Sequence, residues 1–241
     1  MRPLASSSPE RAEPLIRAEG IWKIFGKNAE KVIGTPDADL PRSELREKTG
    51  CVAAVKNVSF EVYPGEIFVV MGLSGSGKST LVRTLIRLIE PTAGRVEIDG
   101  RDVTAASRDE LLQLRRHTSS MVFQHFGLLA HRSVIDNVAF GLEVQGKPKA
   151  ERLARAAEVL KLVGLEDAAN QFPDELSGGM QQRVGLARAF AVDPKVMLYD
   201  EPFSALDPLI RRDMQTMPGL GKTPAAFDVD IAEDGETVGL F

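Results

Sequence analysis

The apolar residues of this chain follow two different periods. Six segments carry the short runs or the alternation that are typical of β-strands, and four carry apolar residues at helical spacing. Three of the helical segments lie between residues 134 and 191, whereas the strands are spread over the rest. The pattern predicts an α/β fold with one helical subdomain. The predicted strands are 15–25, 52–63, 66–71, 94–98, 119–123 and 195–200, and the predicted helices are 79–89, 134–143, 149–163 and 178–191.

A glycine-rich loop joins the predicted strand 66–71 to the predicted helix 79–89. It matches the phosphate-loop pattern G-x-x-x-x-G-K-[ST], with strand, loop and helix in the required order. Glycines let backbone N–H groups turn toward phosphates, and the following helix dipole favours negative charge there. We expect Lys78 to neutralise the terminal phosphates of ATP and Ser79 to hold Mg²⁺; the alternative is a flexible Gly/Ser turn. The loop residues are Gly72, Leu73, Ser74, Gly75, Ser76, Gly77, Lys78 and Ser79.

An acidic pair, Asp200 and Glu201, ends the apolar run 196–199. Carboxylates are ligands that Mg²⁺ prefers, so we expect Asp200 to organise the metal shell directly or through water. Glu201 could polarise the attacking water. An acidic pair at a strand end is on its own more often a solvated turn, and it is the phosphate loop upstream that favours a site.

A second glycine-rich segment, Leu176-Ser177-Gly178-Gly179-Met180-Gln181-Gln182, opens the predicted helix 178–191. With this segment the chain resembles the ATP-binding subunits of ABC transporters over roughly residues 14–214. The resemblance implies a P-loop NTPase fold of the ABC type, with an antiparallel β-subdomain and an α-helical subdomain of about residues 125–180. It also implies that Ser177, Gly178 and Gly179 cap the γ-phosphate bound by a second subunit, in a head-to-tail homodimer.

The same resemblance assigns further residues. Phe25 is similar to the aromatic residue that stacks on adenine, and an ordinary core aromatic is the alternative. Gln124 is similar to the glutamine that touches Mg²⁺ and the attacking water and reports nucleotide state to a membrane permease; an exposed amide is the alternative. Asp207 lies in a segment similar to the loop that crosses the dimer interface, and Thr80 completes the phosphate-binding residues.

Four strings point to one branch of the family. An extra segment, 26–50, separates Phe25 from the next predicted strand, and it resembles an insertion of the glycine betaine/proline importers. The strings 71–77, 88–92 and 203–211 resemble the same branch. Each string is weak alone, and together they are moderately specific.

Composition is typical of a soluble subunit. The chain has 241 residues, is 43% hydrophobic and 27% charged, and carries a net charge of −4. Its apolar runs are far shorter than the roughly 18 residues that span a bilayer, so we expect any membrane association to come through a partner. The resemblance implies a peripheral protein on the cytoplasmic face of the inner membrane. The single Cys51 fits the cytosol. Arg152, Arg155 and Lys161 alternate with acids, which favours a solvated helix face over nucleic-acid binding.

The C-terminal residues depart from the family pattern. The resemblance requires a γ-phosphate histidine after the acidic pair, but His117, His125 and His131 all precede Asp200. The stretch 225–231 alternates apolar and acidic residues, which suits a half-exposed edge strand. We therefore expect a flexible N-terminus at 1–13, an ABC ATPase domain at 14–214 that is incomplete at its C-terminus, and a divergent acidic tail at 215–241. A minimal subunit completed by another chain is the alternative.

The sequence thus predicts an ATP-hydrolysing subunit of a compatible-solute importer that carries glycine betaine or proline. Its expected partners are a permease, a second ATPase subunit and, indirectly, a solute-binding protein. An amino-acid importer subunit and a hydrolysis-deficient remnant remain alternatives. A DNA-repair ATPase is a weaker alternative, since that class would place a long coiled coil between the two glycine-rich loops.

Overall fold

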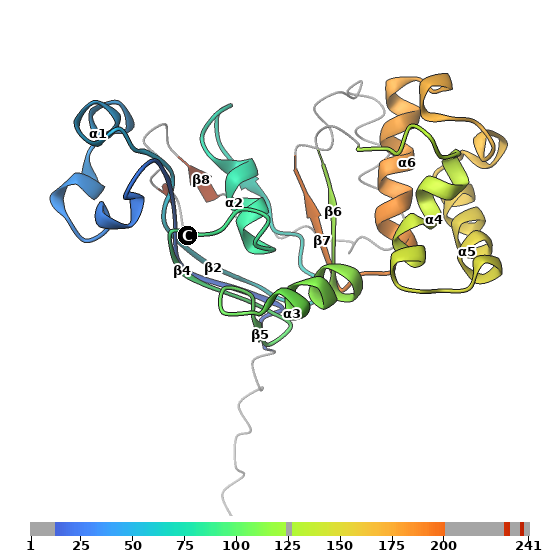
Figure 1. Ribbon diagram of the computed structural model, residues 1–241, viewed down its shortest axis with the longest axis horizontal. Helices are drawn as coiled ribbons and strands as arrows, with labels where there is room; N and C mark the ends of the chain where they lie inside the picture. The colour runs from blue at the N-terminus through green and yellow to red at the C-terminus, as the bar shows by residue number, and fades with distance from the viewer. Residues whose placement is uncertain (1–12, 124–126, 201–228, 232–236, 239–241) are drawn as a thin grey trace, which may run out of the picture.

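The computed structural model describes residues 13–123, 127–200, 229–231 and 237–238, the last two groups by their backbone alone. Figure 1 shows three regions side by side: an antiparallel sheet, a central pair of parallel strands, and a bundle of helices on the opposite side from the sheet.

The antiparallel sheet has the strand order β2-β1-β4-β5. The long pair β1 and β2 runs from Ile16 opposite Val62 to Phe25 opposite Val52. Apolar side chains on one face of the sheet pack with helix α2 in a common core that includes the fully buried Ile21 and Leu81. The sheet strands are β1 (Ile16–Phe25), β2 (Val52–Val62), β4 (Ala93–Ile98) and β5 (Arg101–Asp102).

The central strands form two separate ladders. Strands β6 (Ser119–Val122) and β7 (Val196–Tyr199), both predicted from their apolar runs, pair with each other in parallel. Strand β3 (Val70–Met71) pairs in parallel with β8 (Val229–Ile231). On its other side β8 pairs with β9 (Thr237–Val238).

Two expectations for these strands are wrong. The strand predicted over 66–71 is limited to Val70–Met71, because only these two residues have ladder partners in the described part of the chain. The tail segment Val229–Ile231 is not a sheet edge, because β3 and β9 flank it on both sides. Alternating apolar and polar residues predict that a strand has one buried and one exposed face. They do not predict which other strands will pair with it.

The helical bundle follows the predicted periodicity closely. Its helices begin where expected, and their apolar faces form one core around Val138, Leu160 and Val184, which are each fully buried. Ser133 and Ser177 cap two of the helices by accepting a backbone N–H bond three residues on, as short polar side chains do at helix starts. The helices are α4 (Val134–Val144), α5 (Lys149–Leu162) and α6 (Gly178–Ala191), with short 3-10 turns η4 (Glu166–Ala168) and η5 (Pro173–Glu175) between α5 and α6.

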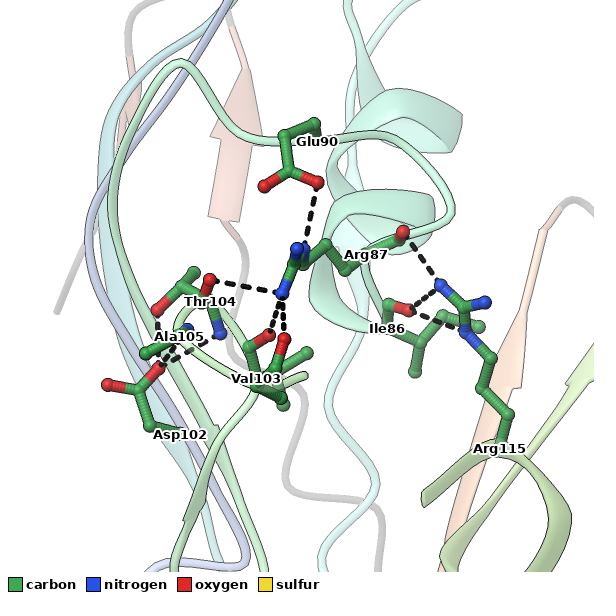
Figure 2. Close-up of polar contacts among 9 residues, drawn as sticks. Ile86, Arg87, Glu90, Asp102, Val103, Thr104, Ala105 and Arg115 are labelled. Atoms are coloured by element: carbon green, nitrogen blue, oxygen red, sulfur yellow. Dashed lines mark hydrogen bonds and ion pairs between the residues drawn. The ribbon is translucent and has the colours of Figure 1, made fainter. Parts of the chain in front are cut away.

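Helix α2 (Lys78–Leu85) follows the phosphate loop and ends four residues before the prediction. Arg87 has a left-handed φ of 53°, which a helix cannot continue through. Its guanidinium instead donates to the carbonyls of Val103, Thr104 and Ala106 and pairs with the Glu90 carboxylate (Figure 2). Ile86, the residue that follows the helix, is still packed in the same core as Leu81 and Leu85, whereas Leu88 is 44% exposed.

Arg115 and Asp102 hold the two segments that Arg87 joins, the end of α2 and the turn after β5. Arg115 donates to the carbonyls of Ile86 and Arg87, and so satisfies groups that the helix end leaves unpaired (Figure 2). Asp102 accepts from the Thr104 hydroxyl and from the backbone N–H groups of Thr104 and Ala105, and these bonds, with Arg95 nearby, lower its pKa to about 2. Arg115 lies in a π-helical turn, η3 (Leu114–Thr118), that follows helix α3 (Arg108–Gln113).

The segment 26–50 folds into three short helical pieces. They are two 3-10 turns, η1 (Ala29–Lys31) and η2 (Pro36–Asp39), and the helix α1 (Arg42–Thr49), which Gly50 ends with a φ of 72°. Leu45 of α1 is completely buried against the end of the antiparallel sheet. The sequence offered no apolar periodicity here, because a single buried residue anchors a helix that is otherwise polar.

Candidate functional site

The phosphate loop lies between β3 and α2, as predicted, and its backbone is fixed by close packing. Gly77 caps α2 with a φ of 104°, and a Cβ added there would lie 2.0 Å from the carbonyl oxygen of Ala54 on β2. Only glycine meets both conditions. Lys78 donates through Nζ to the carbonyls of Gly72 at 2.7 Å and Leu73 at 2.8 Å. The lysine therefore folds back onto the first residues of its own loop.

A pocket of about 190 Å³ opens beside the loop. Phe25, at the end of β1, lies on its wall and is 43% exposed, so the reading of Phe25 as a core aromatic is wrong. Lys23 Nζ lies 4.9 Å from the Phe25 ring centre, a cation–π contact on an exposed aromatic face. The pocket lining brings together Phe25, Arg42, Ala54, Gly75, Gly77, Lys78, Ser79 and Thr80.

Asp200 directly follows β7 and is held from two sides. Its backbone N–H donates to the carbonyl of Val122 on β6 at 3.0 Å. Its side chain is buried, and Oδ2 accepts from Arg83 Nε at 2.9 Å and Nη2 at 2.7 Å. Arg83 lies on α2, so this ion pair ties the helix of the phosphate loop to the acidic strand. The pattern of the phosphate loop does not include Arg83, and sequence reasoning missed it.

Arg42 is the second residue that sequence reasoning missed. It begins α1 and donates to the carbonyl of Gly75 in the phosphate loop at 2.8 Å. A broader groove continues from the pocket along α1, past Ser43 and Arg46. No motif marks Arg42, because its role depends on where the segment 26–50 folds.

The second glycine-rich segment lies at the start of α6, in the helical bundle. Gly178 and Gly179 are open: among the residues that the structure describes, nothing lies within 4 Å of a Cβ added at either. The Ser177 side chain caps its own helix at the Met180 N–H. Figure 1 shows α6 and α2 on opposite sides of the β6–β7 pair, so the fold separates the two helices that carry the glycine-rich loops.

Three predicted site residues, Gln124, Glu201 and Asp207, lie outside the described residues. Of the two Mg²⁺ ligands expected among the described residues, the Ser79 hydroxyl lines the pocket, whereas the Asp200 carboxylate is buried, paired with Arg83 and outside the pocket lining. Both are hard oxygen donors of the type that this ion prefers. Within the described ranges no group of three or more His, Cys, Asp or Glu residues gathers. The described residues therefore form no all-protein cage, and an ion bound at Ser79 would take most of its ligands from phosphate and water.

The comparisons with known proteins agree with this geometry. Residues 55–204 match the family model described as ABC transporter. The chain is 56% identical to the glycine betaine transport ATP-binding protein OpuAA of Bacillus subtilis, over 83% of this chain and 48% of that protein. It is 52% identical to the glycine betaine/proline betaine transport system ATP-binding protein ProV of Escherichia coli, over 83% of this chain and 50% of that protein.

Solved structures give the same result for the fold. The ATP-binding cassette MJ0796, in a dimeric post-hydrolysis state bound to ADP and Pi, aligns with a TM-score of 0.73 at 29% identity. The alignment covers 94% of this chain and 99% of that one. The chain belongs to the ABC transporter family, and the predicted P-loop α/β fold is confirmed. It spans about half the length of the curated relatives named here. No helix in the described ranges is long and apolar enough to cross a membrane.

Proposed function

We propose that this member of the ABC transporter family binds MgATP and hydrolyses it to energise import of a compatible solute such as glycine betaine or proline betaine. The observation that carries the proposal is that Phe25 and the residues Lys78, Ser79 and Thr80 line one and the same pocket. An aromatic face beside a phosphate-binding loop suits a ligand with a planar base and a polyphosphate. The solute class rests on the glycine betaine relatives, which share more than half of their aligned residues with this chain.

The predicted site residues have distinct physical roles in this proposal. Phe25 stacks on adenine, the backbone N–H groups of the loop bind phosphate oxygens, and Lys78 exchanges its carbonyl partners for the terminal phosphates. Mg²⁺ neutralises phosphate charge when bound, and Ser79 and Asp200 would hold it. Outside the described residues, Glu201 polarises the attacking water and Gln124 contacts the metal and the water.

Within one chain, the second glycine-rich segment starts α6, on the opposite side of the β6–β7 pair from the phosphate-loop helix α2. The exposed start of α6 can donate backbone N–H groups to an anion. A second subunit in head-to-tail arrangement would bring its Ser177, Gly178 and Gly179 to the nucleotide, with Asp207 at the interface. We propose that this dimer works beneath a membrane permease on the cytoplasmic face of the inner membrane, with a solute-binding protein acting indirectly.

Nucleotide binding is tested by Lys78→Ala in titration calorimetry with MgATP. Losing the cation at the terminal phosphates should weaken binding by about 100-fold or more, since each charge-assisted hydrogen bond contributes roughly 1.5–3 kcal/mol. Lys195→Ala is the matched control, because Lys195 pairs with Asp99 on an exposed surface and lies outside the pocket. Equal affinity of the Lys78→Ala variant and the unaltered chain would show that the loop is not the site.

Hydrolysis and dimerisation are tested together by Glu201→Gln. This substitution keeps the shape of the side chain but removes the base, so MgATP should bind and the dimer should accumulate without turnover. Gel filtration with MgATP and a phosphate-release assay give the two readouts. A chain that binds MgATP but releases no phosphate before the substitution would instead favour a hydrolysis-deficient protein.

An importer of another small solute is the second candidate. The chain is 55% identical to the methionine import ATP-binding protein MetN of Carboxydothermus hydrogenoformans over 157 residues, which is 65% of this chain. The glycine betaine relatives align over a longer part, 83% of the chain, at a similar identity. Transport assays with the cognate permease and competing betaine or methionine would separate the two solutes.

A further inference from the structure

The segment 26–50 is fixed firmly to the sheet that carries Phe25. Leu45 is fully buried there, in a cluster with Ile24 and Ala53 of the neighbouring strands. The Lys56 ammonium on β2 donates to the carbonyl of Leu40 at 2.8 Å. Where the segment begins, Gly26 packs directly on Cys51, with only 2.8 Å between Sγ and an added Cβ. The start of α1 therefore has a defined place beside the phosphate loop.

Arg42 fixes one peptide unit of the phosphate loop. The Gly75 carbonyl accepts from the Arg42 guanidinium, and the N–H of the same peptide, on Ser76, donates to the Leu73 carbonyl at 3.1 Å. Both polar groups of this peptide are thus paired. A loop whose peptides are held before the ligand arrives loses less entropy on binding.

Arg42 also lines the pocket itself, together with Lys78 and Phe25. A guanidinium has five N–H donors in a planar fork, and the bond to Gly75 uses one of them. Guanidinium groups bind phosphate oxygens with strong, directional hydrogen bonds. Arg46, one turn further along α1, is exposed and lines the broader groove but not the pocket.

We propose that Arg42 is a nucleotide-binding residue: its guanidinium holds the phosphate loop at Gly75 and donates to a phosphate of the bound nucleotide. The segment 26–50 thereby contributes a wall of the pocket and a second cation beside Lys78. This inference rests on the proposed binding of MgATP in the same pocket. It assigns a role to a segment that the phosphate-loop pattern does not include.

The test compares the affinities of three ligands, MgATP, MgADP and adenosine, for the full 241-residue chain and four variants. Arg42→Ala should weaken MgATP binding by about 10- to 100-fold, weaken MgADP binding less, and leave adenosine unchanged, because the lost partner is a phosphate. Arg42→Gln retains a donor for Gly75 but no charge, so it should keep the melting temperature and lose the same phosphate-dependent affinity. Arg42→Lys should recover part of it.

Arg46→Ala is the matched control, since it removes the same charge from the same helix outside the pocket. The MgATP affinity of Arg46→Ala should stay within about twofold of the unaltered chain, because solvent and salt screen the interaction between an exposed charge outside the pocket and the bound nucleotide. Equal losses for adenosine and MgATP in the Arg42→Gln variant would overturn a phosphate contact, and so would an unchanged MgATP affinity. Failure of the unaltered chain to bind any of the ligands would overturn the proposed function itself.

Discussion

The two glycine-rich loops of this protein use glycine for different reasons. In the phosphate loop, Gly77 has a positive φ and touches the Ala54 carbonyl, so the chain itself excludes a side chain there. At the start of α6, Gly178 and Gly179 have ordinary backbone angles, and no described atom approaches the space of a side chain. The first glycine is explained by contacts within one chain. The contacts of the described residues do not explain the second pair, and a closely approaching ligand or second subunit would explain it.

The loops also differ in how their helices are anchored. Helix α2 is tied to the acidic strand by an ion pair with a buried carboxylate, Arg83 to Asp200. Helix α6 is tied by Arg183 to the neutral carbonyl of Val163, at 3.1 Å. The helix of the phosphate loop is thus held by a charged contact within the chain, whereas the loop at α6 is a solvent-facing end of the helical bundle. The predictions below test this contrast, in order of their expected effect on folding stability.

The largest effect is expected for Gly77→Ala. The added methyl collides with the Ala54 carbonyl and forces a residue with a side chain to a φ of 104°. Strain and displacement of the loop should reduce the free energy of unfolding by about 3 kcal/mol and abolish MgATP binding. Thermal unfolding and calorimetric titration measure the two effects.

Gly75→Ala is the control that measures the cost of the backbone strain alone. Gly75 has a φ of 82°, but nothing in the described chain lies within 4 Å of an added Cβ. It should therefore lose only the strain part, about 1 kcal/mol. If both variants were equally stable, the contact with Ala54 would not be what fixes the loop.

The next prediction compares the two arginines, Arg83 on α2 and Arg183 on α6, that hold the two helices. Arg83→Ala leaves the Asp200 carboxylate buried without its cation and should cost about 2 kcal/mol, less than for a fully buried pair because the Arg83 side chain is 38% exposed. Arg183→Ala frees carbonyl oxygens that water can satisfy, and should cost about 0.5–1 kcal/mol. Chemical denaturation of both variants measures the difference. Equal costs would mean that the two helices are anchored alike.

A pH titration tests the contact between the end of α2 and the turn after β5. The pKa of Asp102 is lowered to about 2, chiefly by the Thr104 hydroxyl, so its contribution to stability is complete above the ordinary value of 3.8 and is lost as the pH falls through about 2. At neutral pH, Asp102→Asn should therefore be less stable by about 1 kcal/mol, a figure reduced for solvent screening.

The gap between the unaltered chain and Asp102→Asn should shrink between about pH 4 and pH 2. Melting temperatures across that range follow it. A gap that did not change with pH would show that the charge of Asp102 contributes nothing to the contact.

The smallest effect on stability is expected for Gly178→Ala. The space is open, and alanine is a better helix former, so the variant should gain a few tenths of a kcal/mol up to about 1 kcal/mol. Its ATP hydrolysis should nevertheless fall by about tenfold or more, because the methyl keeps a second subunit from approaching closely. Unchanged hydrolysis by Gly178→Ala would show that close approach of a second subunit does not require glycine at this position.

Much of the fold and part of the site could be predicted from the sequence. The helix Gly178–Ala191 was predicted to the residue, and the strands Ile16–Phe25 and Val52–Val62 to within one, because periodicity and caps act over neighbouring positions. The order of strand, phosphate loop and helix was likewise predicted and is confirmed. The roles assigned to Gln124, Glu201 and Asp207 remain predictions.

Only the tertiary structure decided which distant groups meet. Arg83 and Asp200 are 117 residues apart, and Arg42 and Gly75 are 33 apart, so no local pattern links either pair. The same holds for β8, whose alternation predicted an edge but whose pairing with both β3 and β9 is a property of the assembled sheet. The sequence determined the long strands β1 and β2 and the helices α4, α5 and α6 through local hydrogen bonding and apolar spacing. The contacts that complete the pocket depend on how those elements pack, because each requires two segments to be held in place at once.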